Sequence, residues 1–309
     1  MEASLPWQPD EAVAGRVEAL AHTLRATVRD TLEPLVLAWH PSLRERSSAE
    51  FNKMLELSTK MTLVGQACAE VLGAPFEARH RRIAALFGGC CFLADSFIDN
   101  FGAAVAREYL RRFSELFATG WFEVRNERER LFYIMAARLF AERDVLDPMV
   151  RQSVLKLHEA QALDALLRIE PSRTALMSEA QRRILLKRVA RDRGGHTIIL
   201  LTALLAPALP VSLLAGLFAA GSLFMYIDDH GDCFTDRREG RLTYMNQLRR
   251  PQRTLHKIVT AHFLCVLATL PSGAGRDILL GTLARYYSTR LEKHRAQRKR
   301  AGTAWDVYE

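Results

Sequence analysis

Apolar residues return every three or four positions along most of the 309-residue chain. Val13, Val17, Leu20 and Leu24 show this spacing near the start, as an amphipathic helix requires. Few segments alternate with a period of two, and the isoleucine-rich piece 198–201 is too short to argue for a sheet. The pattern therefore predicts an all-α chain, with helices at about 10–37, 49–72, 76–100, 104–118, 126–142, 147–167, 176–192, 211–236, 253–269 and 273–297.

No internal repeat, low-complexity linker or change of composition divides the chain. With 49% apolar and 25% charged residues it can bury a sizeable core, which excludes a disordered protein. A chain of this length could form two domains, but large single helical domains also reach it. We expect one all-helical domain over 1–309, with an N-terminal helical segment over 1–45 and a C-terminal tail over 297–309.

One long uncharged run, Thr197 to Ile227, requires a test for a membrane span. Pro207 and Pro210 divide it into pieces of 10 and 17 residues (197–206 and 211–227), shorter than the roughly 20 residues of a spanning helix. The run therefore predicts a pair of buried helices in a bundle and no transmembrane segment.

A ladder of carboxylates follows this run. Asp228, Asp232 and Asp236 are spaced i, i+4, i+8, with Asp229 beside the first, so a helix would place the three within roughly 80° of arc. Like charges at this spacing repel by about 0.2–0.5 kcal/mol per pair, so cations must compensate them. Three following arginines could do so in part, Arg237, Arg238 and Arg241; Mg²⁺ would do so better. The alternative is a solvated, acidic helix end.

A second acidic pair, Asp95 and Asp99, lies in the segment 88–102 among apolar residues such as Phe92 and Ile98. Charged residues are rarely buried unless they are paired, although these two could simply face solvent. The two motifs lie 133 positions apart (228 − 95), each at one end of an apolar helix. If the helices pack together, the two rows of carboxylates could face each other across a cavity and hold metal ions between them.

This arrangement resembles the class I isoprenoid synthase fold, a helical bundle around a central cavity, over roughly residues 50–290. The D-D-x-x-D-x-x-x-D sequence from Asp228, followed by Gly240-Arg241, looks like the second motif of trans-prenyl diphosphate synthases. The spacing of Asp228, Asp232 and Asp236-Arg237 also resembles bacterial tetraprenyl-beta-curcumene synthases and, less closely, squalene/phytoene synthases.

The first motif, Asp95-Ser-Phe-Ile-Asp99-Asn, separates these branches. It lacks the dense D-D-x-x-D and the arginine pair of chain-elongating enzymes, and the chain also lacks their N-terminal G-K-x-x-R-P. The sparse D-x-x-x-D favours the squalene/phytoene synthase-like branch, including terpene cyclases built on it. The asparagine–serine–glutamate triad of typical plant or fungal cyclases is absent as well.

The resemblance implies a Mg²⁺-dependent terpene synthase, a carbon–oxygen lyase that ionises a prenyl diphosphate, releases pyrophosphate and cyclises or rearranges the carbocation. The alternative is a prenyltransferase that couples two isoprenoid units, either squalene/phytoene synthase-like or chain-elongating. The implied cofactor is a cluster of three Mg²⁺ ions shared with the diphosphate. The implied catalytic residues are Asp95, Asp99, Asp228 and Asp232, and the metal ligands are these four with Asp229 and Asp236.

Residues for the diphosphate and the cavity follow from the same resemblance. In such enzymes a helix broken at a small-residue pair lies against the substrate, and Gly194-Gly195 could form such a break or a plain loop between helices. The candidate diphosphate-binding residues are Arg188, Arg191, Arg237, Arg285 and Tyr286. The candidate cavity-lining residues are Phe92, Phe97, Phe224 and Tyr226, although any of them could be ordinary core. His230 could deprotonate a cation, although a surface histidine is the simpler interpretation.

The net charge bears on which kinds of partner the chain could bind. The net charge is +8, and much of the excess lies in the segment 285–300. A helical nucleic-acid-binding protein would use that basic face, but carboxylate rows repel phosphates unless metal fills them. The missing spans argue against a membrane prenyltransferase. The sequence is compatible with peripheral membrane contact and with a homodimer.

The five cysteines form neither a zinc motif nor a disulfide framework. The acidic start of the chain has no apolar segment typical of a secretory signal. We therefore expect a cytoplasmic protein.

Overall fold

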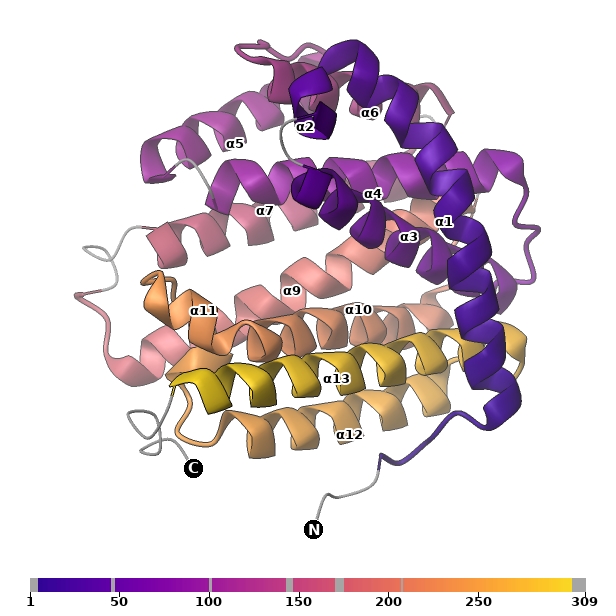
Figure 1. Cartoon of the computed structure of the whole chain (residues 1–309), viewed down its shortest axis with the longest axis vertical. Helices are drawn as coiled ribbons and strands as arrows, with labels where there is room; N and C mark the ends of the chain where they lie inside the picture. Colours follow the sequence, from indigo (N-terminus) through magenta and orange to yellow (C-terminus); the bar gives the residue numbers. More distant parts are fainter. Residues whose placement is uncertain are drawn as a thin grey trace. The chain divides into compact units, whose positions relative to one another are not determined.

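The computed structural model describes residues 5–45, 48–99, 102–142, 147–169, 175–206 and 208–301. These residues form helices and connecting loops with no strand among them (Figure 1), which confirms the all-α prediction. The helices are α1 (Glu11–Trp39), α2 (Pro41–Glu45), α3 (Ser48–Val71), α4 (Ala78–Asp99), α5 (Gly102–Thr119), α6 (Glu127–Glu142), α7 (Pro148–Ile169), α9 (Glu179–Leu205), α10 (Val211–Gly231), α11 (Cys233–Arg238), the 3₁₀ turn η1 (Met245–Gln247), α12 (Pro251–Thr269) and α13 (Ala274–Ala301).

Most predicted helix bounds agree with the structure within a few residues, but two predictions are wrong. The segment 211–236 is not one helix, because α10 ends at Gly231 and α11 begins at Cys233. The helix predicted to end at residue 192 continues to Leu205 without a break at Gly194-Gly195. The short elements α2 and η1 were not predicted, because neither is long enough to show a periodic pattern.

Contacts within the chain gather into two compact units. The N-terminal unit comprises Ala14–Gln152 with Leu200–Leu209, and the C-terminal unit comprises Met1–Val13, Ser153–Ile199 and Pro210–Glu309. Both carboxylates of the α4 motif belong to the first unit, and the ladder on α10 and α11 belongs to the second. The prediction of a single domain stays a prediction.

In the N-terminal unit, α4 packs closely on α3. A Cβ added to Gly88 of α4 would meet the Cα of Ser58 on α3 at 2.5 Å, so glycine lets these two helices approach. Beside this crossing, Phe97 stacks on Tyr109 of α5 with ring centroids 4.4 Å apart. The edge of the Phe97 ring meets Phe132 of α6 at a centroid distance of 6.3 Å. Phe97, Tyr109 and Phe132 therefore form a buried aromatic cluster that joins α4, α5 and α6.

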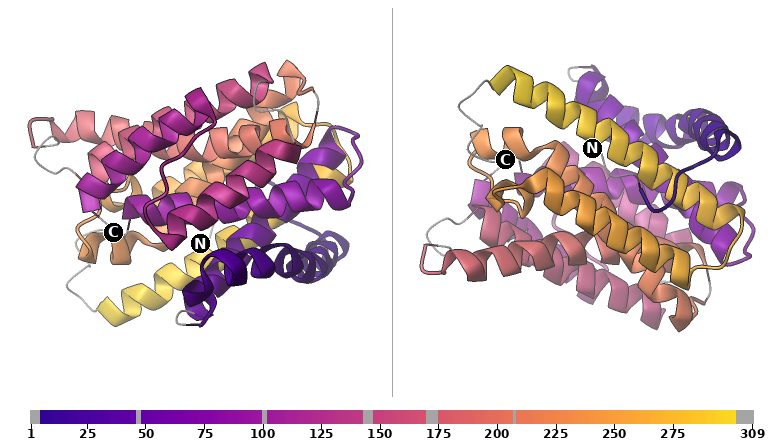
Figure 2. Two further views of the ribbon diagram at one scale, coloured as in Figure 1. Left: turned by 90° about the horizontal axis from the view of Figure 1, so that it is seen from above. Right: turned by 90° about the horizontal axis from the view of Figure 1, so that it is seen from below.

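In the C-terminal unit, α12 and α13 run alongside α10, as the successive views show (Figures 1 and 2). α9 crosses α10 where two glycines meet, since a Cβ on Gly194 would lie 2.2 Å from the carbonyl oxygen of Gly221. Ser222 Oγ donates to the carbonyl of Arg191 at 2.8 Å, and Tyr226 Oη donates to that of Lys187 at 3.0 Å. The glycine pair of α9 thus serves close helix packing, which explains why the helix does not break there.

The uncharged run forms the end of α9 and most of α10. Residues 198–206 are all buried, whereas Val211 at the start of α10 is exposed, so the second helix is largely rather than fully buried. Within the described part of the chain, α10 is the one helix long and apolar enough to cross a membrane, and most of its apolar window is buried. Core helices pass the same test of length and composition.

Candidate functional site at the end of α10

The site begins where the apolar helix α10 meets its carboxylates. Asp232 follows the last residue of α10 with φ −102° and ψ 2°, so the helix kinks there. Backbone hydrogen bonds nevertheless continue across the kink, from the Asp232 amide to the Asp228 carbonyl at 3.0 Å and from the Asp236 amide to the Asp232 carbonyl at 2.9 Å. Asp228 and Asp232 therefore remain one turn apart, while Asp236 moves onto α11.

Three side chains of α13 meet these two carboxylates. The Asp228 carboxylate accepts hydrogen bonds from the Tyr286 hydroxyl and from the Arg290 guanidinium. The Asp232 carboxylate accepts from the Lys293 ammonium, and from Arg290 Nη1 at 3.4 Å. We call these five residues, Asp228, Asp232, Tyr286, Arg290 and Lys293, the α10–α13 ionic cluster.

Arg290 is itself held in place by Tyr286. Its Nε donates to the Tyr286 hydroxyl oxygen at 3.0 Å, and its guanidinium carbon lies 5.1 Å from the centroid of the tyrosine ring. Phe224 of α10 packs against the same ring with centroids 5.7 Å apart. An aromatic pair thus supports the apolar side of the cluster.

The electrostatics of the cluster keep Tyr286 protonated and Arg290 charged. Burial, followed by the neighbouring Asp228 charge, raises the pKa of Tyr286 well above its usual value. Burial alone would lower the pKa of Arg290, but Asp228, followed by Tyr286 and Asp232, outweighs it and raises that pKa. The Asp228 and Asp232 side chains are 37% and 26% exposed. The cluster therefore balances two carboxylates with two cations at a position that solvent can reach.

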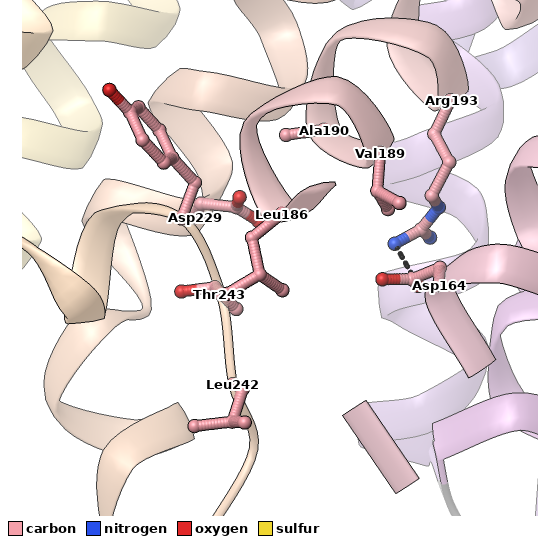
Figure 3. Close-up of a pocket in the computed structure, with 9 residues that line it drawn as sticks. Asp164, Leu186, Val189, Ala190, Arg193, Asp229, Leu242 and Thr243 are labelled. Carbon is pink, nitrogen blue, oxygen red and sulfur yellow. Dashed lines mark hydrogen bonds and ion pairs between the residues drawn. The ribbon is translucent and has the colours of Figure 1, made fainter. Parts of the chain in front are cut away.

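Asp229 points away from the cluster and lines a small pocket that is partly open to solvent (Figure 3). Consecutive helical residues differ by about 100° in direction, so Asp228 and Asp229 cannot share one face. Across the pocket, Arg193 Nη1 of α9 pairs with Asp164 Oδ2 of α7 at 2.6 Å, and both side chains are buried. The remaining lining residues are Leu186, Val189, Ala190, Leu242, Thr243 and Tyr244.

Asp236, the last member of the ladder, is buried on α11. Of the three arginines that follow the ladder, Arg241 approaches it, with its Nη1 3.9 Å from Asp236 Oδ1. The backbone amide of Arg241 also donates to the Asp236 carbonyl at 2.8 Å. Arg241 therefore lies near Asp236, and α13 supplies cations to Asp228 and Asp232.

The first acidic motif ends α4. Asp95 is half-buried, and its neighbour Ser96 accepts a hydrogen bond from Arg128 Nη1 at 3.0 Å. Asp99 is the last residue of α4, and its side chain, like residues 100–101, lies outside the described part of the structure. That the two motifs face each other across a cavity stays a prediction, since they belong to different units.

The other predicted diphosphate ligands lie apart from the cluster or at the surface. Arg188 and Arg191 are exposed on α9, and both form ion pairs with Asp192 of the same helix. Arg237 on α11 and Arg285 on α13 are also exposed. Tyr286, by contrast, donates a hydrogen bond to the Asp228 carboxylate of α10.

The candidate cavity residues take different positions. Phe92 is half-buried on α4, and Phe97 is buried in the aromatic cluster of the N-terminal unit. Tyr226 is buried between α9 and α10, with its hydroxyl used in a helix contact. Phe224 contacts Tyr286 and so lies beside the ionic cluster. A cavity-lining role for the four stays a prediction.

The interpretation of His230 as a surface histidine is wrong. The residue is fully buried, and its ring stacks on that of His294 of α13 with centroids 4.0 Å apart. Burial, followed by the charge of His294, lowers the pKa of His230 to about 3. His230 is therefore neutral at physiological pH, and its role as a base stays a prediction.

Sequence reasoning missed Arg290 and Lys293, which it counted only as part of the basic segment 285–300. The signal was present, because Tyr286, Arg290 and Lys293 are spaced i, i+4, i+7 and so share one face of a helix. Comparison with known proteins adds nothing to this assignment, since no family model, curated protein or solved structure matches the chain.

Proposed function

We propose that this chain is a Mg²⁺-dependent class I terpene synthase that ionises a prenyl diphosphate and releases pyrophosphate. The observation that supports this proposal is the α10–α13 ionic cluster, in which two carboxylates one turn apart meet an arginine, a lysine and a tyrosine. The motif that carries the family resemblance thus lies beside the groups that diphosphate chemistry requires.

Breaking the carbon–oxygen bond of a prenyl diphosphate leaves a highly charged pyrophosphate anion. Donors and cations placed where this charge develops lower the barrier. Arg290 and Lys293 provide two positive charges, and Tyr286 provides a hydroxyl that burial keeps protonated. When bound, Mg²⁺ would neutralise a further part of that charge.

The carboxylates fit Mg²⁺ in the manner usual for phosphate-binding enzymes. Among the described side chains, no group of three or more His, Cys, Asp or Glu residues is placed to hold a metal ion together. Magnesium does not need such a group, because one or two carboxylates with water and substrate phosphates complete its coordination. Asp228 and Asp232 would be its ligands on the protein.

The surroundings of the cluster also suit a carbocation. α10 is apolar up to Ile227, and Phe224 packs on the ring of Tyr286 beside the carboxylates. Aromatic faces stabilise cations, and an apolar wall keeps water from the intermediate.

Purified protein should be incubated with prenyl diphosphates from C10 to C35, in Mg²⁺ or in EDTA. We expect Mg²⁺-dependent release of pyrophosphate and a hydrocarbon or alcohol with the carbon number of the substrate, measured by mass spectrometry. A product with added carbons would instead identify the alternative, a prenyltransferase. Absence of release with every substrate would refute both.

Variants connect the activity to the cluster. Asp228→Asn and Asp232→Asn should each abolish release, because an amide neither carries charge nor binds Mg²⁺ well. The two carboxylates are partly exposed, at 37% and 26%, so the melting temperatures of both variants should stay near that of the parent protein. Glu292→Gln, at an exposed carboxylate beside Lys293 on α13, is the matched control and should keep full activity.

A further inference from the structure

We propose that Arg290 and Lys293 are the diphosphate-binding residues of this site and that, without ligand, they block the two carboxylates that the metal needs. This inference rests on the proposed function and deepens it. It assigns the anion-binding role to residues in the middle of α13 rather than to Arg188, Arg191, Arg237 or Arg285. The ligand class is an inorganic or organic diphosphate bound together with a divalent cation.

Contacts along its whole side chain hold Arg290 in one orientation, unlike a surface arginine. Its side chain lies over Gly231, its Nε donates to Tyr286 at 3.0 Å, and its guanidinium lies over the tyrosine ring. The two terminal nitrogens then face Asp228 and Asp232. A guanidinium held in this way offers a two-pronged contact that matches carboxylate and phosphate oxygens equally well.

Lys293 completes the arrangement one turn further along α13, with its ammonium on Asp232. The lysine side chain is 40% exposed, so its ammonium can swing from the carboxylate to a ligand in solvent. A lysine contributes a compact charge that needs no fixed orientation, which suits such an exchange. Arg290 therefore sets the position of the anion, and Lys293 supplies a charge that moves with it.

Charge balance predicts how the ligands affect each other. A metal ion that binds Asp228 and Asp232 alone must displace two cations from them, which weakens its affinity. Pyrophosphate alone must compete with the same carboxylates for Arg290 and Lys293. When both bind, each charge finds an opposite partner, so either ligand should increase the affinity of the other by the same factor.

Isothermal titration of the full chain with Mg²⁺, with inorganic pyrophosphate, and with pyrophosphate in saturating Mg²⁺ tests this exchange. Lys293→Met should bind Mg²⁺ alone more tightly than the parent, because the competitor of the metal is removed. The same variant should bind pyrophosphate in Mg²⁺ about tenfold more weakly, since a charge-assisted contact is lost. Lys299→Met, at an exposed lysine on the same helix, is the control and should change neither affinity.

Opposite changes in the two affinities distinguish an exchange from a structural role. If Lys293→Met weakened the binding of both ligands, or changed the affinity for neither, the inference would be overturned. Arg290→Lys keeps the positive charge but loses the two-pronged guanidinium contact. This variant should fold like the parent and bind pyrophosphate more weakly. An unchanged affinity for pyrophosphate would also overturn the inference. If the Lys293→Met protein still turned over prenyl diphosphates and bound both ligands as tightly as the parent, this inference would be refuted but the proposed function would not. Absence of turnover and of binding in the parent would refute the proposed function with it.

Discussion

Gly231 of α10 lies directly beneath the side chain of Arg290 of α13. A Cβ added to Gly231 would come within 2.7 Å of Arg290 Cδ, 3.1 Å of its Cβ and 3.2 Å of its Cγ. Because glycine leaves this space open, the arginine stem lies flat over the end of α10. The guanidinium can then reach the carboxylates on either side of the kink, Asp228 and Asp232.

We expect Gly231→Ala to lift Arg290 away from both carboxylates. Overpacking of this kind lowers the free energy of unfolding by about 1–3 kcal/mol, which urea denaturation would measure. Gly15→Ala is the matched control, because Gly15 lies within α1 with nothing within 4 Å of an added Cβ. That substitution should raise stability by about 0.5–1 kcal/mol. Equal effects at the two glycines would contradict the contact described above.

Gly194→Ala tests whether the glycine pair of α9 serves packing or bending. The added Cβ would lie 2.2 Å from the carbonyl oxygen of Gly221, which belongs to the backbone of α10 and cannot move alone. We expect a loss of about 3 kcal/mol or more, seen as a lower melting temperature. If Gly194 made no close contact with α10, the sign would be opposite, since replacing glycine by alanine in an unstrained helix raises stability by about 1 kcal/mol.

A buried ion pair in the N-terminal unit should be sensitive to removal of one partner. Arg112 Nη1 and Nη2 donate to Glu129 at 2.7 and 2.6 Å, and both side chains are almost fully buried. Arg112→Met should lower the free energy of unfolding by about 3–5 kcal/mol, because it leaves Glu129 buried without its cation. Changing both residues, Arg112→Met with Glu129→Gln, should recover part of that loss in a denaturation experiment.

The exposed neighbour Arg111 provides the comparison for that pair. It forms ion pairs with Glu108 and Glu115 on the surface of α5. Arg111→Met should leave stability almost unchanged, since water and salt screen such pairs. A loss as large as that of Arg112→Met would show that burial does not decide the difference.

Acid should destabilise the C-terminal unit through histidines whose pKa the fold lowers, and one of them is the half-buried His262 of α12. Burial lowers its pKa, although its hydrogen bond to the Ile258 carbonyl, at 2.8 Å, acts in the opposite direction. The edge of its ring meets Tyr226, and the charge of Lys187 lowers the pKa further. The neutral form is therefore the one that the folded state favours.

The sign of the pH dependence follows from this depressed pKa. The stabilisation from neutral His262 is complete above the unfolded-state pKa of about 6.5 and is lost as the pH falls below it, because the unfolded chain then binds the extra proton. The slope for one such group is at most about 1.4 kcal/mol per pH unit. His262→Phe, which keeps the aromatic edge, should flatten the fall in stability between pH 7 and pH 5, and an unchanged slope would contradict it.

Several features of the fold could be predicted because they depend on local spacing. Helical periodicity located α3, α4, α12 and α13 to within a few residues. The uncharged run predicted the buried end of α9 and the core position of much of α10. The prediction of where helices end was less successful. Gly194-Gly195 suggested a helix break, but these glycines lie inside α9, where Gly194 allows the close contact with Gly221.

The candidate site could be predicted in part. The spacing of Asp228 and Asp232 determined that both would lie on one face at the end of an apolar helix, because the helix repeat alone fixes that relation. The sequence could not determine where α10 would kink, so it placed Asp236 in the same row. In the structure α10 ends at Gly231, Asp236 lies on α11, and Asp236 and His230 are both buried.

The sequence by itself determined an all-helical chain and the spacing of its carboxylate motifs, because helix periodicity and motif spacing are local properties. Only the tertiary structure decided which cations meet the carboxylates. Arg290 and Lys293 lie about 60 positions from Asp228 and Asp232, and they reach them because Gly231 lets α13 pack on α10. Such a pairing depends on how two helices cross, and the hydrophobic pattern of neither helix contains that information.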